Sequence, residues 1–189
     1  MTWYTFFKSV HVVAVAIWVG GALMIQALAF RITRSGDAKR QADFAKDTEI
    51  VGMRLFIPTT WILLLSGIAM MVNLHWAWGQ NWIIFGLIAF GLSFVVGAGF
   101  LGPEGGRIAE TIKREGPASS AAQFRIRRIL VISRCELVIL IAVIVNMVVK
   151  PNGNVGWFWG ILVAMLVGIV LVVAASRRGV RQVPAHATD

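Results

Sequence analysis

The sequence is poor in cysteine, in acidic residues and in recognisable catalytic motifs. Its one cysteine, Cys135, excludes an internal disulfide. There is no phosphate-binding glycine loop, no CxxC, no HExxH and no serine, histidine and aspartate set that could share a site. Zinc chemistry and nucleophilic catalysis therefore have no support. Only 14% of the residues are charged, and 18 basic residues stand against nine acidic ones.

Long apolar runs dominate what is present, since 58% of the residues are hydrophobic. A helix needs about 20 mostly apolar residues to cross the hydrocarbon core of a bilayer. The sequence therefore predicts an all-α fold, a polytopic integral membrane helical bundle with the lipid bilayer as its main partner. The bundle covers residues 1–176, with helices at about 3–30, 52–74, 82–101, 126–149 and 157–175, and residues 177–189 form a polar cytoplasmic tail.

Prolines and glycines indicate where these helices begin and end. Pro58 falls in the first turns of the second helix, where its missing amide donor is least harmful. Gly102 and Pro103 are expected to end the third helix. The basic segment that follows contains a short amphipathic helix, which Gly116 and Pro117 interrupt.

The distribution of charge predicts the orientation in the membrane. Basic residues cluster after the first helix, between the third and fourth, and after the fifth, whereas the two other loops carry only Lys150. By the positive-inside rule the N-terminus lies outside and the C-terminus in the cytoplasm. The same rule accounts for the net charge of +9, so we expect no nucleic-acid partner.

We expect a multi-pass protein of the bacterial cytoplasmic (inner) membrane. Six tryptophans would form an outer aromatic belt: Trp3, Trp76, Trp78, Trp82, Trp157 and Trp159.

One stripe of the first helix is the best candidate for a functional site. His11, Trp18 and Gly21 share a helical face, with Lys8 one turn before them. Ionisable groups inside a bilayer are costly and usually face the interior of a bundle. The small residues beside His11 would let another helix or a flat cofactor approach closely.

His75, Met70 and Met71 at the outer end of the second helix could complete a ligand set with His11. A neutral imidazole can bind haem iron opposite a second histidine or a methionine, and soft methionines with an imidazole also suit copper. Alternatively, His11 hydrogen-bonds a backbone carbonyl or a serine, while the methionines only fill space and His75 is an interfacial residue.

A second polar group lies toward the cytoplasmic side, where Glu136 is deep enough to need a partner. Arg134 is two residues away and faces elsewhere on a helix, so Arg54 is the better partner for a bidentate ion pair. We interpret these three residues as a structural clamp between helices. A proton-handling or substrate-binding role is the alternative.

Three helices carry a further set of residues in a recognisable order: Tyr4, Lys8, His11, Trp18, Gly20, Gly21, Met53, Arg54, Leu55, Pro58, Gly67, Arg134, Glu136, Lys150 and Pro151. In their order and spacing these residues resemble the HemJ-type protoporphyrinogen oxidases, and the first helix is also similar to that of the CopD-like copper-resistance membrane proteins. The third helix lacks the family's lysine and histidine. The chain is therefore most similar to the uncharacterised predicted integral membrane proteins related to this group.

The resemblance implies a bundle that binds b-type haem, with His11 as axial ligand and Lys8 nearby. It also implies electron transfer or the oxidation of a porphyrin-like substrate at the membrane. Two alternatives remain. The chain could be a non-catalytic subunit or assembly factor of a larger complex or a homo-oligomer, or it could handle copper through His11, Met70 and Met71.

Overall fold

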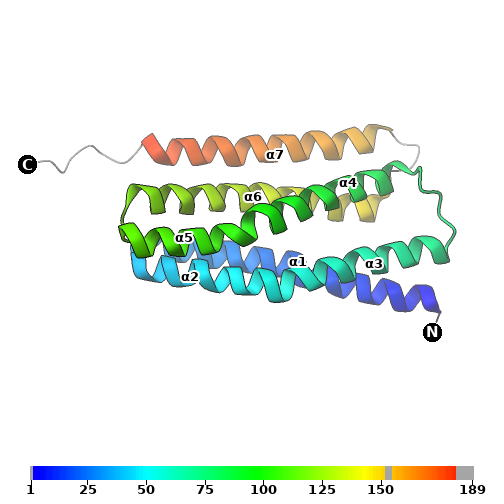
Figure 1. Cartoon of the computed structure of the whole chain (residues 1–189). Helices are drawn as coiled ribbons and strands as arrows, with labels where there is room; N and C mark the ends of the chain where they lie inside the picture. Colours follow the sequence, from blue (N-terminus) through cyan, green and yellow to red (C-terminus); the bar gives the residue numbers. More distant parts are fainter. Residues whose placement is uncertain (1, 152–154, 182–189) are drawn as a thin grey trace, which may run out of the picture.

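The computed structural model describes residues 2–151 and 155–181, and within these ranges its regular structure is entirely helical (Figure 1). Five continuous helical segments are long and apolar enough to cross a membrane. These segments are Trp3–Arg34, Lys39–Asn73, Asn81–Glu115, Ser120–Val149 and Gly156–Arg177. The predicted all-α class with five candidate spans is confirmed.

Three of the spans are single helices: α1 (Trp3–Arg34), α6 (Ser120–Val149) and α7 (Val155–Arg181). Side-chain caps fix where two of them begin. The Thr2 hydroxyl accepts a hydrogen bond from the Thr5 amide, and the Ser119 hydroxyl accepts one from the Ala122 amide. Each helix is longer than the apolar run that predicted it. Part of the predicted polar tail, residues 177–181, belongs to α7, and residues 182–189 lie outside the described residues.

Each of the other two spans contains a π-helical turn between two α-helices, and we call these two the jointed spans. One consists of α2 (Ala38–Val51), the π turn η1 (Gly52–Phe56) and α3 (Ile57–Asn73). The other consists of α4 (Asn81–Val96), the π turn η2 (Gly97–Leu101) and α5 (Gly102–Glu115). The prediction that Gly102 and Pro103 end a helix is therefore wrong. The helix that contains the predicted second span begins earlier than residue 52, at Ala38. The amphipathic segment instead continues the third span, and α5 ends at Gly116, whose φ is +86°.

A change of hydrogen-bond register explains how both prolines are accommodated. In each π turn the amide just before the proline bonds to a carbonyl five residues back: Ile57 to Gly52, and Gly102 to Gly97. A proline ring normally clashes with the carbonyl four residues earlier. The wider π turn gives that carbonyl room, so the chain remains helical through Pro58 and Pro103.

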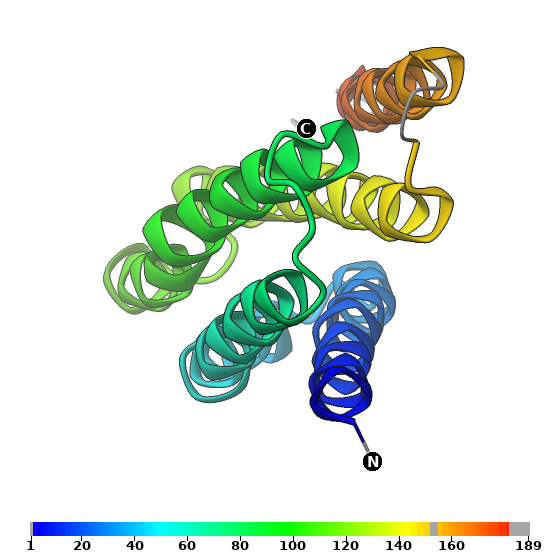
Figure 2. The same cartoon turned by 90° about the vertical axis from the view of Figure 1, so that its right-hand side faces the viewer.

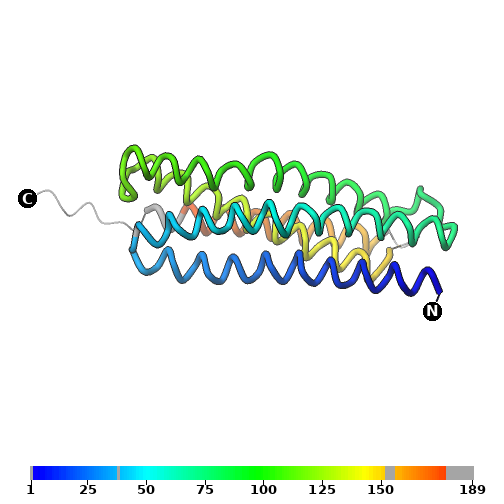
Figure 3. Tube along the Cα trace, turned by 60° about the horizontal axis from the view of Figure 1, so that its bottom comes forward, coloured from blue at the N-terminus to red at the C-terminus, as the bar shows by residue number. Residues whose placement is uncertain are grey.

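The helices lie roughly along one common axis and pack against each other in pairs (Figures 1 and 3). The main pairs are α1 with α3, α4 with α6, and α2 with α5, while α7 packs mainly on α6. Viewed from the end, α7 lies at the edge of the bundle, away from α1 and α3 (Figure 2).

The two ends of the bundle differ in chemistry. At what we call the charged end, α1 turns into α2, α5 turns into α6, and α7 finishes (Figure 1). At the tryptophan end lie the start of α1, the α3–α4 loop and the C-terminus of α6 (Figure 1). Every ion pair among the described residues joins side chains of α2, α5 and α6 at the charged end.

Candidate functional site

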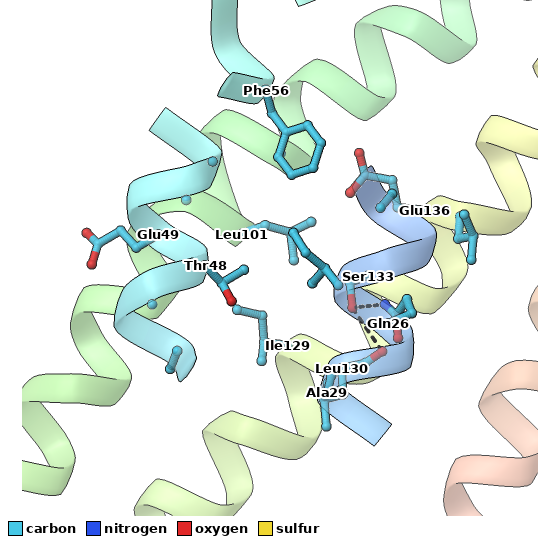
Figure 4. Close-up of a pocket in the computed structure, with 18 of the residues that line it drawn as sticks. Gln26, Ala29, Thr48, Glu49, Phe56, Leu101, Ile129, Leu130, Ser133 and Glu136 are labelled. Carbon is cyan, nitrogen blue, oxygen red and sulfur yellow. Dashed lines mark hydrogen bonds between the residues drawn. The ribbon is translucent and has the colours of Figure 1, made fainter. Parts of the chain in front are cut away.

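A cavity of about 190 Å³ lies inside the bundle, between α1, α6 and both jointed spans. Its wall is mostly apolar, and Phe56, Leu101, Ile129 and Leu130 are among the residues that surround it (Figure 4). No described residue of α7 lines it. The cavity therefore belongs to the six helices α1–α6.

Both π turns form part of the cavity wall. Gly52, Met53 and Phe56 of η1 line it, as do Gly97 and Leu101 of η2. Single-turn π segments occur frequently at functional sites, because they redirect side chains and break the regular helical register. The two π turns belong to different spans, and both face the same cavity.

Two acidic residues line the wall, and the Glu136 carboxyl group points toward the Phe56 ring, whereas that of Glu49 points away from the cavity (Figure 4). Glu136 is 9% exposed and has no hydrogen bond or ion pair with any described residue. A Cβ added to Gly97 would lie 3.8 Å from Glu136 Oε1, so the carboxylate rests against η2. An unpaired carboxylate at this depth is costly unless something in the cavity bonds to it.

Two further polar groups face the same space. Ser93 is 2% exposed, and its hydroxyl has no hydrogen-bond partner among the described residues. Gln26 donates from Nε2 to the Ser133 hydroxyl at 2.6 Å (Figure 4). Buried hydroxyls are nearly always bonded to protein or water. The apolar cavity thus presents an unused hydroxyl and an unused carboxylate.

Half of the predicted stripe on α1 reaches this cavity. Trp18 lines it, and its ring lies 6.2 Å from that of Phe90. A Cβ on Gly21 would be 2.9 Å from the Phe56 ring, so Gly21 lets that ring lie directly on α1. These two candidates contact the cavity wall, while His11 and Lys8 do not line it.

His11 packs against α3 instead. Its Nδ1 is 3.0 Å from the Leu63 carbonyl and 3.1 Å from the Ser66 hydroxyl. The ring also lies on Gly67, where a Cβ would be 3.3 Å from His11 Cε1. The alternative of a backbone carbonyl or serine partner for His11 therefore describes the observed contacts. Donation from Nδ1 to the carbonyl leaves Nε2 without a partner among the described residues.

The other members of the predicted ligand set lie in different environments. Met71 is buried in a small apolar core with Trp82 and Ile83, and Met70 is half-buried. His75 is exposed at the end of α3, with φ of +52°. Lys8 is exposed and lies 5.9 Å from the Tyr4 ring. None of the contacts described here joins Met70, Met71, His75 or Lys8 to the His11 ring.

The expected ion pair between Arg54 and Glu136 does not form. Arg54 is exposed, and no ion pair within 4 Å joins it, Arg134 or Glu136 to any described residue. The reason is the register of η1: residues 52, 53, 56 and 57 line the cavity, which leaves Arg54 on the outward face. Glu136 is thus a wall residue of a cavity rather than half of a clamp.

Sequence reasoning missed the cavity and the place of Ser93 on its wall. Ser93 and Gly97 are small residues four positions apart, a spacing typical of close helix packing, and the structure places both at the cavity wall. The usable signal was Glu136 itself, because an acidic residue within an apolar span marks a functional site by default.

The fold defines a polytopic helical membrane protein with a cavity between its helices. The chain belongs to the family of predicted integral membrane proteins designated DUF2269, which matches residues 5–151. The match spans α1 through α6, the helices that surround the cavity. This match places the chain in a family of small membrane proteins. It does not assign the chain to the HemJ-type or CopD-like group. No curated protein and no solved structure matches the chain.

Proposed function

We propose that this protein binds a small amphiphile from the membrane, whose head occupies the cavity and donates a hydrogen bond to Glu136. The observation that carries the proposal is that the Glu136 carboxylate and the Ser93 hydroxyl lie on a mostly apolar wall without a partner among the described residues. A few convergent polar groups in an apolar pocket are the usual composition of a small-molecule site.

The volume limits what the head can be. An apolar cavity of about 150 Å³ admits benzene, so 190 Å³ accommodates a single ring with one or two substituents. Phe56, Leu101 and Ile129 would contact the ring. Glu136 would accept from a hydroxyl or amine on it, and Ser93 Oγ would donate to or accept from a second polar atom.

A matched pair of probes, 4-propylphenol and propylbenzene, tests this proposal. Thermal stabilisation of the detergent-purified protein would be measured at equal free probe concentrations. We expect the phenol to bind more tightly, because a hydrogen bond to a charged acceptor contributes about 1.5–3 kcal/mol. The corresponding ratio of dissociation constants is about tenfold to a hundredfold.

The variant Glu136→Leu should abolish this preference for the phenol. Glu110→Leu is the control, because Glu110 lies on the exposed face of α5 and pairs only with Arg114. Equal preference in the Glu136 variant and the unaltered protein, or no stabilisation by either probe, would contradict the proposal.

A second candidate function is b-type haem binding through His11, with a role in electron transfer or porphyrin oxidation. Its support is the contact between His11 Nδ1 and the Leu63 carbonyl. A histidine that binds a metal through one ring nitrogen typically donates the N–H of the other ring nitrogen to a carbonyl or carboxylate. This hydrogen bond fixes the tautomer and leaves the first nitrogen free for the metal. His11 would hold the iron through Nε2, and the haem would supply reversible one-electron chemistry.

Optical spectra of the purified protein, oxidised and dithionite-reduced, test this candidate. A Soret band that shifts on reduction should be lost in His11→Ala and kept in His75→Ala, since His75 is exposed and apart from the His11 contacts. Metal analysis of the same samples tests the copper alternative. A flat spectrum without bound metal would favour a non-catalytic subunit or assembly factor.

A further inference from the structure

The tryptophan end gathers aromatic rings around Lys150. The Lys150 ammonium lies 4.4 Å from the Trp76 ring and 5.1 Å from the Trp82 ring, and these two rings meet edge to face at 5.2 Å. Lys150 caps α6 in the left-handed conformation, and its amide bonds to the Asn146 carbonyl. The backbone and two aromatic faces therefore hold this cation in place.

A second lysine joins the same cluster from α1. Lys8 lies 5.9 Å from the Tyr4 ring, and Tyr4 packs edge to face on Trp76 at 6.5 Å. Burial lowers the pKa of Lys150, and repulsion from the charge of Lys8 lowers it further. Contacts through Tyr4 and Trp76 therefore connect the two lysines. We call Tyr4, Lys8, Trp76, Trp82 and Lys150 the lysine–aromatic cluster; they come from α1, the α3–α4 loop, α4 and the C-terminal cap of α6.

The described chain supplies no negative charge to balance these lysines. Eight of the nine acidic residues lie between positions 37 and 136, on α2, α5 and α6 or in the turn before α2, and the ninth, Asp189, lies outside the described residues. Neither Lys8 nor Lys150 is within ion-pair distance of a carboxylate in the described part of the chain. Two neighbouring cations without counter-charge favour an external anion.

We propose that Lys8 and Lys150 bind the phosphate of an anionic phospholipid headgroup. Aromatic belts mark the level of lipid headgroups, and the cluster is built from such aromatic residues. Trp3 and Phe6, 71% and 46% exposed, are further apolar side chains near the start of α1 at the same end of the bundle. Each ammonium carries three donors for phosphate oxygens.

Thermal unfolding in detergent, with added lipid, tests the proposal. The probe is dioleoylphosphatidylglycerol, and its matched control is dioleoylglycerol, which has the same tails and glycerol but no phosphate. Inorganic phosphate at the same concentration is the third arm. We expect the phospholipid to raise the unfolding midpoint, and the other two to leave it unchanged.

The double variant Lys8→Gln/Lys150→Gln should raise the half-saturating concentration of the phospholipid at least tenfold. Lys46→Gln/Lys113→Gln removes the same charge from exposed positions at the charged end and should behave as the unaltered protein. Lys8→Arg/Lys150→Arg changes the same two side chains but keeps both charges, so it should keep the lipid response. A kept response would attribute the loss in the glutamine double variant to the missing charge rather than to a folding defect.

Three outcomes would overturn the proposal. The first is an unchanged phospholipid response in the glutamine double variant. The second is an equal effect of dioleoylglycerol, which would mean that the tails alone stabilise the bundle. The third is an equal effect of inorganic phosphate, which would assign the lysines to a free anion rather than to a lipid.

Discussion

Among single residues, Glu104 on α5 is the most buried acidic side chain in the described chain. It is 1% exposed and accepts hydrogen bonds from Arg125 at 2.7 Å and from Arg107 at 3.3 Å. Arg125 belongs to α6, so this pair joins two helices at the charged end. Removing the carboxylate would leave a partly buried guanidinium without its partner, which is more costly than losing a surface pair.

We therefore expect Glu104→Gln to lower the free energy of unfolding by about 2 kcal/mol, the usual value of a hydrogen bond to a charged group. Glu110→Gln is the matched control: its pair with Arg114 at 2.8 Å is exposed on both sides, so the expected loss is about 0.5 kcal/mol or less. Unfolding in mixed micelles, followed by circular dichroism, measures both. Equal losses would contradict a special role for the buried pair.

The helical elements show how far sequence reasoning extends and why it stops. Apolar runs and tryptophan positions predict the five spans, because lipid imposes length and composition directly. Glycine followed by proline predicts a helix end at Gly102 and Pro103, yet the π turn there keeps the helix continuous. Whether such a pair ends a helix or widens it depends on packing against other spans, which sequence periodicity does not contain.

The same π turns explain why only part of the site was predictable. Arg54 was expected to face Glu136, and the register of η1 places it outside. Trp18 and Gly21 were predicted as site residues, and they do line or pack on the cavity wall. His11, on the same predicted stripe, instead packs on Leu63, Ser66 and Gly67 of α3, so one helical face contacts two different surroundings.

The close packing of α2 on α5 makes a prediction at the scale of elements. A Cβ on Gly105 would lie 2.9 Å from Glu49 Cβ and 3.0 Å from the Ala45 carbonyl oxygen. Because a backbone oxygen cannot move aside alone, Gly105→Ala must push the two helices apart. We expect a loss of about 1–3 kcal/mol in the free energy of unfolding, as for other overpacked sites.

The control for this prediction is Gly91→Ala in the middle of α4, where no atom lies within 4 Å of the added Cβ. Alanine there should be neutral or stabilising by about 1 kcal/mol or less, since it restricts the unfolded chain. Similar changes at both glycines would mean that backbone entropy, rather than helix contact, dominates at Gly105.

At the scale of the whole molecule, the chain divides into a cavity-forming part and an outer helix. Helices α1–α6 surround the cavity and coincide with the family match, while α7 packs mainly on α6 and contributes none of its described residues to the wall. The lysine–aromatic cluster lies at the tryptophan end of these six helices, whereas the Glu104 pair lies beside the cavity, since Gly102, Gly105 and Ile108 of α5 line it. The bundle therefore has one polar cluster at its tryptophan end and another at the level of the cavity.

The orientation of this bundle is the last prediction. Basic residues gather at the charged end, so we expect that end to face the cytoplasm and the tryptophan end to face outward. In a Cys135→Ser background, a cysteine would be placed at exposed Gly79 in the α3–α4 loop or at exposed Lys113 on α5. A membrane-impermeant maleimide should label Gly79→Cys in intact cells. It should label Lys113→Cys only after the membrane is opened, and the Cys135→Ser parent not at all. The reverse pattern would invert the topology, and labelling of both positions in intact cells would show that the charge bias does not fix one orientation.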